Sequence, residues 1–406
     1  MLDILIKGAT VNGFTGKMDV AVTGGRITQV SPAIEAEAET TVQAKGGFLA
    51  PSFVDSHMHI DKALVESSDG SENLKDAIEE SNRYFQSVRG VAAKDIERRA
   101  SKLLRWAAAA GTCAVKTHIT INEYYDMAGF DVLWDMKRRF RGVIDVYNIT
   151  PWYKEFDAQW HAAAKKGMID FVGGYPGLLG GDDYAAEVDQ IFALALKYGL
   201  PVDLHVNESD SPDVRCFEYV LKKTIQTGMQ GRVSCSHVTG LNAVDDDTAA
   251  RVLDLAAQAQ VNIITLPSCN LYLMGRADKE PVRRGLTRVR ELQKRGVNVA
   301  FASDNVRDHF RPFGNADMLQ EALLSAQVLQ YGTKKLMNLI YDMGTVCPAK
   351  NALLQDYGVE PGCRADFVLY DERSAPEAIV AQKPRRLVVK DGRIIAKRGK
   401  LVKGIG

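Results

Sequence analysis

The chain has few cysteines and lacks the motifs in which cysteines usually act. Six cysteines are spread over 406 residues, and no two of them form a Cys-x-x-Cys pair. Scattered cysteines of this kind indicate reduced thiols rather than a disulfide framework. No stretch approaches the roughly 18 consecutive apolar residues that a membrane-spanning helix requires, and no secretory signal is visible. We therefore expect a cytoplasmic protein without a membrane partner.

The chain also has no excess of charge of either sign. Lysine and arginine together number 51, and so do aspartate and glutamate. This balance gives no electrostatic reason to expect nucleic acid as a partner. Hydrophobic residues make up 46% of the chain and charged residues 25%, which excludes a wholly disordered or fibrous protein. We expect a globular protein that does not bind nucleic acid.

Eight short runs of β-branched and apolar residues recur through the middle of the chain, with helical stretches between them. Strict alternation of strand and helix predicts right-handed βαβ units and a parallel sheet. Eight such units in about 250 residues are typical of a TIM-type (β/α)8 barrel. A doubly wound open sheet has the same local pattern and stays open as an alternative. The runs are 48–57, 113–121, 142–150, 169–175, 201–207, 232–238, 261–267 and 297–303.

Both ends of the chain consist of short β-type segments separated by turn residues, such as the pair Gly24 and Gly25. Each end is too small to bury a hydrophobic core alone. We therefore expect the two ends to pack together as one small β-sandwich domain. The predicted division is residues 1–50 with 350–406 for this domain, and residues 51–349 for the barrel.

Polar residues of the types that bind metals follow several of the predicted strands. His57 and His59 end the first run, His205 the fifth, His237 the sixth and Asp304 the eighth. Side chains at positions i and i+2 of a strand face the same way, so the two imidazoles of the His-x-His pair can converge on one cation. TIM-barrel active sites are built at the carboxyl ends of the strands. The joint pattern predicts a metal site there.

Several longer motifs carry a resemblance to the amidohydrolase superfamily, and within it to the cytosine deaminase group. By that resemblance, one divalent metal would be held by His57, His59, His205 and Asp304. His237 would hydrogen-bond the attacking water. The motifs cover nearly the whole chain and are PSFVDSHMHIDK, VKTHITI, VDLHVNESD, VSCSHVTGL, GCRADFVLYDERS and the long block that runs from NLYLMG to NADM.

The number of metal ions follows from the fourth predicted strand. Binuclear relatives add a bridging carboxylated lysine at its end, whereas this strand reads Met-Ile-Asp-Phe-Val-Gly-Gly-Tyr-Pro. One metal ion is therefore expected, and zinc and iron both suit three imidazoles and a carboxylate. Lys62 follows the His-x-His pair in the first loop, where a structural or gating role is expected.

The resemblance implies a hydrolytic deaminase of a small nitrogen heterocycle, such as a pyrimidine, aminotriazine or pterin. Metal-activated water would attack the amino-bearing ring carbon, and ammonia or an amine would leave. Glu208, three residues after His205, matches the acid/base glutamate that would protonate the ring. Two alternatives stay open: hydrolysis of a cyclic amide or ester by the same bound hydroxide, and metal or ligand binding without turnover. Family members often form homo-oligomers, and a barrel of this size could do so.

The expected substrate contacts depart from those of cytosine deaminases. These enzymes carry a glutamine after the third strand, where this chain has Trp152, and a second aspartate where it has Asn305. A tryptophan offers a flat stacking face and one donor, so we expect a more aromatic pocket and a substrate other than cytosine. Phe310 is expected to wall this pocket, and His118, at the end of the second strand, to line or support it. The sequence at and after Asn305, with Ser-Asp-Asn followed by Asn-Ala-Asp-Met, also resembles that of N-isopropylammelide amidohydrolases.

Overall fold

The computed structural model describes residues 1–65, 71–178 and 183–405. Eight parallel strands form one sheet whose spatial order is the chain order, and a bridge between Met58 and Asp304 joins its first and last edges. A doubly wound sheet would reverse its order at a switch point, so that alternative is excluded and the predicted barrel is confirmed. The strands are β6 (Phe53–Met58), β7 (Thr112–His118), β8 (Asp145–Pro151), β9 (Phe171–Gly174), β10 (Val202–Val206), β11 (Val233–His237), β12 (Asn262–Thr265) and β13 (Asn298–Phe301).

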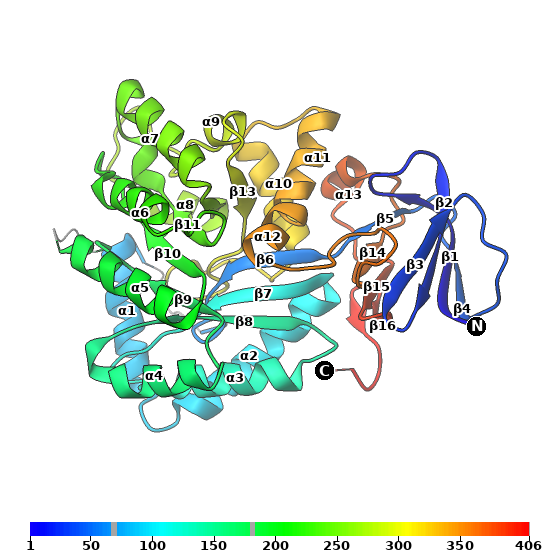
Figure 1. The fold of residues 1–406 in the computed structure, drawn as a ribbon, viewed down its shortest axis with the longest axis horizontal. Helices are drawn as coiled ribbons and strands as arrows, with labels where there is room; N and C mark the ends of the chain where they lie inside the picture. The colour runs from blue at the N-terminus through cyan, green and yellow to red at the C-terminus, as the bar shows by residue number, and fades with distance from the viewer. Residues whose placement is uncertain (66–70, 179–182, 406) are drawn as a thin grey trace.

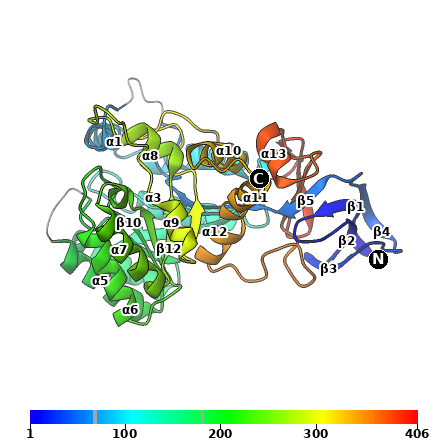
Figure 2. The ribbon, with the colours of Figure 1, turned by 90° about the horizontal axis from the view of Figure 1, so that it is seen from above.

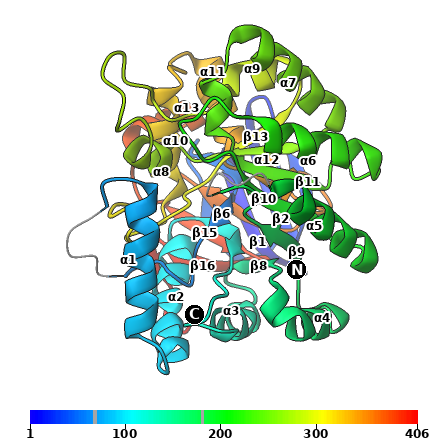
Figure 3. The ribbon, with the colours of Figure 1, turned by 90° about the vertical axis from the view of Figure 1, so that its left-hand side faces the viewer.

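Helices surround these strands, as Figure 3 shows from the side opposite the terminal segments. Because helices cover the sheet, nearly every barrel-strand residue is buried on both faces. Among the described residues, no helix combines the length and hydrophobicity needed to cross a membrane. The helices are α1 (Leu74–Ser87), α2 (Ala92–Ala109), α3 (Ala128–Arg139), α4 (Asp157–Lys165), α5 (Tyr184–Tyr198), α6 (Arg215–Gln226), α7 (Asp246–Ala259), α8 (Pro267–Leu273), α9 (Val289–Lys294), α10 (Met318–Val328), α11 (Lys334–Met343), α12 (Val346–Asn351) and α13 (Ala375–Ala381).

The two ends of the chain form a separate mixed sheet beside the barrel (Figures 1 and 2). Ile6 and Val20 from the N-terminal part pack in one core with Phe367 and Val389 from the C-terminal part. A separate β unit built from both ends is therefore confirmed. Its strands are β1 (Leu2–Val11), β2 (Lys17–Thr23), β3 (Arg26–Ser31), β4 (Ala38–Gln43), β5 (Phe48–Pro51), β14 (Phe367–Leu369), β15 (Leu387–Lys390), β16 (Arg393–Lys397) and β17 (Lys400–Leu401).

The predicted first run, residues 48–57, is two strands rather than one. Its first part, β5, pairs with β14 of the terminal sheet, and its second part, β6, opens the barrel. The two strands part after Pro51, the last residue of β5, which has no N–H of its own to donate. Beyond it, the N–H of Ser52 still donates to Asp366, whereas that of Phe53 donates to Gly111 beside the barrel strand β7.

A buried ion pair joins strands β7 and β10 inside the barrel. The Lys116 ammonium donates to the Asp203 carboxylate and to Asn351 Oδ1 at 2.7 Å, and both charged side chains are fully buried. Burial opposes the ionisation of Asp203, but the Lys116 ammonium and His118 hold the pKa of its carboxyl below the ordinary value. Burial lowers the pKa of the Lys116 ammonium, and the attraction of Asp203 opposes this shift. Neither side chain is exposed to solvent.

Replacing Asp203 by Asn should destabilise the protein, because it leaves the Lys116 ammonium buried without a carboxylate. The expected loss is about 3–5 kcal/mol in the free energy of unfolding, measured by urea denaturation. The double variant Lys116→Met, Asp203→Leu replaces both charges by apolar groups and should recover most of this loss. A single variant as stable as the wild type would show that the pair is not a buried charge interaction.

Candidate metal centre and active site

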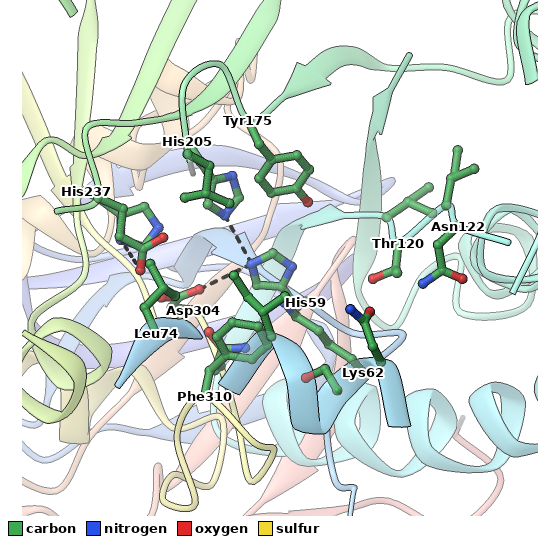
Figure 4. Close-up of a pocket in the computed structure, with 18 of the residues that line it drawn as sticks. His59, Lys62, Leu74, Thr120, Asn122, Tyr175, His205, His237, Asp304 and Phe310 are labelled. Atoms are coloured by element: carbon green, nitrogen blue, oxygen red, sulfur yellow. Dashed lines mark hydrogen bonds and ion pairs between the residues drawn. The ribbon is translucent and has the colours of Figure 1, made fainter. Parts of the chain in front are cut away.

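The five strand-end residues singled out from the sequence come together at one end of the barrel. Figure 4 shows four of them, His59, His205, His237 and Asp304. His57 lies in β6 and His59 just beyond it, while His205 lies in β10, His237 ends β11 and Asp304 follows β13. All five side chains are buried. Asp304 Oδ1 lies 3.3 Å from His57 Nε2 and 3.4 Å from His59 Nε2, and His59 Nε2 lies 3.2 Å from His205 Nε2.

These distances fit a shared metal ion. A tetrahedral cation with bonds of about 2.0–2.1 Å separates its ligand atoms by about 3.3–3.4 Å, close to the separations between these side chains. His57 Nε2 and both Asp304 carboxylate oxygens are buried without a hydrogen-bond partner. Burial lowers the pKa of His57 to about 4, so its ring is neutral, as a metal ligand must be. The donor set can therefore hold a divalent metal.

The backbone turns sharply where two of these strands end. His237 has a φ of 67° and Asp304 a φ of 58°, both in the left-handed region that residues other than glycine seldom adopt. Such conformations persist only where the surroundings impose them, and they gather at functional sites. Here they occur at the two strand ends that aim His237 and Asp304 into the same cavity.

The outer nitrogen of His57 is held by a residue of β11, a strand that is not adjacent to β6 in the barrel. Its Nδ1 lies 2.8 Å from the Ser236 hydroxyl oxygen, which directs Nε2 toward Asp304. Hydrogen bonds to the nitrogen that faces away from the metal fix the orientation of a metal-binding imidazole, and losing one typically costs about 10–100-fold in metal affinity.

Ser236→Ala is therefore expected to weaken zinc binding by about 10–100-fold, measured by titration against a competing chelator. Ser234→Ala is a matched control, because Ser234 is equally buried two residues earlier in the same strand. Its zinc affinity should equal that of the wild type. Equal affinities in both variants would show that Ser236 does not orient His57.

Glu208 lies beside the cluster in a form suited to giving up a proton. It is buried, and its Oε1 is 3.3 Å from His237 Nδ1, which Asn270 Nδ2 also approaches at 3.1 Å. Burial, with a smaller contribution from the Asp304 charge, raises the pKa of Glu208 well above its ordinary value. A carboxyl whose pKa is raised in this way is suited to act as a general acid.

His118 lies beneath the cluster rather than in the cavity. Its ring centroid is 4.3 Å from those of both His57 and His205, and its Nε2 is 3.5 Å from Asp203 Oδ1. It is not among the residues that line the cavity. Of the two roles expected for it, this placement favours support of the metal-binding rings.

A cavity of about 510 Å³ opens over the cluster, and Asn305 and Phe310 line it as expected. Trp152 does not line it, since its indole N–H donates to Asp157 at 2.9 Å. The next residue, Tyr153, lines the cavity instead, together with Tyr175, whose ring lies 4.4 Å from that of His205. An aromatic wall is therefore present, but it comes from tyrosines.

The first loop and one face of α1 also line the cavity, and the α1 residues were missed because they lie outside the strand-end motifs. Lys62, expected to be structural or gating, lines the cavity with its ammonium 4.0 Å from the Phe310 ring centroid. One face of α1 also contributes, and a sequence signal for it exists only in the apolar spacing of that helix. The α1 residues are Leu74, Ile78, Ser81, Asn82 and Phe85.

Comparison with known proteins agrees with this architecture. The chain is 27% identical to the N-isopropylammelide isopropyl amidohydrolase of Pseudomonas sp. strain ADP, over 97% of each chain. It is 29% identical to a pterin deaminase of Rhizobium rhizogenes, over 96% of this chain and 92% of that one. The crystal structure of 5-methylcytosine deaminase from Klebsiella pneumoniae liganded with 5-fluorocytosine superposes with a TM-score of 0.90 at 25% identity, covering 99% of both chains.

The fold and the site define a (β/α)8-barrel hydrolase with side chains able to hold a divalent metal. Residues 154–396, more than half of the chain, match the amidohydrolase family, and the chain belongs to that family. It acts on carbon–nitrogen bonds as a hydrolase. The resemblance expected from the sequence is confirmed.

Proposed function

We propose that this protein is a hydrolytic deaminase of a small nitrogen heterocycle and that it uses one divalent metal ion, zinc or iron. The observation that carries the proposal is the placement of Glu208. The Glu208 carboxyl lies next to His237, at the edge of a cluster whose ligand atoms are spaced for one cation. Metal site and proton donor thus face one cavity.

His57, His59, His205 and Asp304 would hold the metal, which when bound lowers the pKa of a water molecule toward about 7. In the proposed reaction, Asp304 and His237 orient this water and accept its proton. Glu208 protonates a ring nitrogen, which makes the amino-bearing carbon more electrophilic. As a carboxylate, it would then take the proton of the hydroxyl on the attacked carbon and pass it to the departing amine, because an unprotonated amine is a poor leaving group. The proton held by Asp304 or His237 would restore the Glu208 carboxyl.

The substrate class is supported by the relatives, which are named for N-isopropylammelide, pterin and 5-methylcytosine. All three are nitrogen heterocycles. The cavity of this chain has a tyrosine-rich wall and Asn305 beside Asp304. These features favour a ring other than cytosine.

We further propose a cytoplasmic location for the protein, which is supported by its six free thiols.

A substrate panel tests the proposal. Aminopyrimidines, aminotriazines and pterins are incubated with metal-loaded protein, and released ammonia or amine is measured together with acid production. The proposal predicts ammonia or amine release from at least one ring. Acid without ammonia would instead identify a cyclic amide or ester hydrolase, and tight binding without turnover would identify a binding protein.

A further inference from the structure

The cavity is larger than one heterocyclic ring requires. A cavity of roughly 150 Å³ accepts a benzene-sized molecule, whereas the cavity over the metal cluster measures about 510 Å³. The excess is too great to be explained by an amino or oxo group on the ring. Part of the cavity therefore lies outside the space that a single six-membered ring fills.

The side of the cavity away from the reacting groups has apolar walls. In Figure 4, Thr120 and Asn122 lie across His59 and Tyr175 from His237 and Asp304. We define the apolar arm as the part of the cavity lined, next to Thr120 and Asn122, by Ile78 and Phe85 of α1 and by Ile119 and Ile121 after β7.

Packing holds the walls of the apolar arm in place. Phe85, Ile119 and Ile121 are buried and belong to the main hydrophobic core. The Phe85 ring centroid lies 4.5 Å from that of Tyr125 behind it. The charged residues that line the cavity come from elsewhere, near the metal cluster and at the start of α5, and are Lys62, Glu208, Asp304, Asp183 and Glu187.

The reaction sets the direction in which a substrate lies. The amino-bearing carbon has to meet Glu208, His237 and Asp304, which lie together. The opposite edge of the ring then faces the apolar arm. A group on that edge would leave water for walls of isoleucine and phenylalanine, which favours an uncharged, apolar group.

We propose that the substrate is a heterocycle with an alkyl or aryl substituent on the edge opposite the amino-bearing carbon, and that the apolar arm binds this substituent. This inference rests on the proposed function, because it takes the reacting carbon to lie at Glu208. It adds a specificity determinant, the apolar arm, that the metal chemistry does not require.

A homologous series of substrates tests the inference. A ring that the enzyme deaminates is prepared with hydrogen, methyl, ethyl and propyl at the edge opposite the amino group. Burying one methylene is worth about 0.8 kcal/mol, so kcat/KM should rise by up to roughly fourfold per carbon and by at least about tenfold over the series. A flat or falling series would overturn the inference, as would a gain only when the alkyl group is on the leaving amine.

Filling the apolar arm provides the second test. Ile78→Trp should lower the ratio of kcat/KM for the propyl and unsubstituted substrates by about tenfold or more. Glu79→Trp adds the same bulk at the next position of α1, where Glu79 is exposed and makes only a 3.9 Å surface ion pair with Lys75. It should keep the wild-type ratio, and an equal ratio in both variants would contradict the inference.

Three results have to be told apart: a folding defect of the variant, failure of the inference, and failure of the proposed function. If Ile78→Trp does not fold, as judged by circular dichroism, Ile78→Ala is used, and its removal of apolar contact should lower the same ratio by at least about threefold. If the ring is deaminated but no alkyl preference exists, the inference alone fails. If no ring in the panel releases ammonia or amine, the proposed function fails and the inference falls with it.

Discussion

Replacing Glu208 by Gln is expected to lower kcat by a factor on the order of 10²–10⁴, the usual contribution of a general acid or base. The amide keeps the size of the side chain but has no acidic proton to give to the ring. Burial raises the pKa of the Glu208 carboxyl well above its ordinary value, which favours the proton-donating form in the wild type. The measurement is steady-state turnover of a deaminated ring, with metal content determined on the same sample.

Metal content separates this effect from damage to the site. Glu208 is absent from the three groups of side chains whose ligand atoms cluster closely enough for an ion, so the variant should retain metal as the wild type does. Glu218→Gln removes a carboxylate that pairs with Arg251 on the surface, and it should change neither quantity. Full activity of Glu208→Gln would refute the proton-donor role.

Asp304→Asn is expected to have the second large effect, on metal retention as well as on rate. Asp304 Oδ1 lies within 3.4 Å of the Nε2 atoms of two histidines, and it is the only carboxylate in the expected ligand set. A neutral amide is a much weaker ligand for zinc or iron. Losing a hydrogen bond to a metal ligand typically lowers metal affinity by about 10–100-fold. Changing a ligand itself should lower metal affinity by at least that much, and turnover should fall with it.

Asp308→Asn is the matched control for this variant. Asp308 is also buried, accepts from Asn305 Nδ2 at 2.6 Å, and has a pKa raised to about 6 by burial. It lies in none of the groups of side chains that could hold an ion among the described residues. Dialysis against a chelator followed by elemental analysis should therefore strip Asp304→Asn and spare Asp308→Asn. Equal retention in the two would remove Asp304 from the metal site.

The barrel and its metal-type residues could be predicted because both follow local rules. Strand and helix alternate strictly, and parallel strands bring their carboxyl ends to one face. His57, His205 and Asp304 needed only that rule to be placed together. The division of residues 48–57 at Pro51 was missed, because the choice between two sheets depends on partners, β7 and β14, that are distant in the chain.

The walls of the cavity could be predicted less well. Trp152 and Tyr153 are neighbours just past the end of β8, and only the path of the chain beyond Pro151 decides which of them faces the cavity. The hydroxyl of Ser236 and the amide of Asn270 support His57 and His237 through contacts between strands and helices far apart in sequence. The raised pKa of Glu208 depends on burial by these surroundings and has no local sequence signal.

The most direct test of the metal site is a titration of metal-stripped protein with zinc, and separately with ferrous iron under argon. Bound metal per chain and amine release from a deaminated ring are followed in the same samples. Binding should saturate at one ion per chain, activity should rise in proportion to occupancy, and Asp304→Asn should bind far less. Activity in the stripped protein, or saturation without any gain in turnover, would contradict a single catalytic metal held by these four side chains.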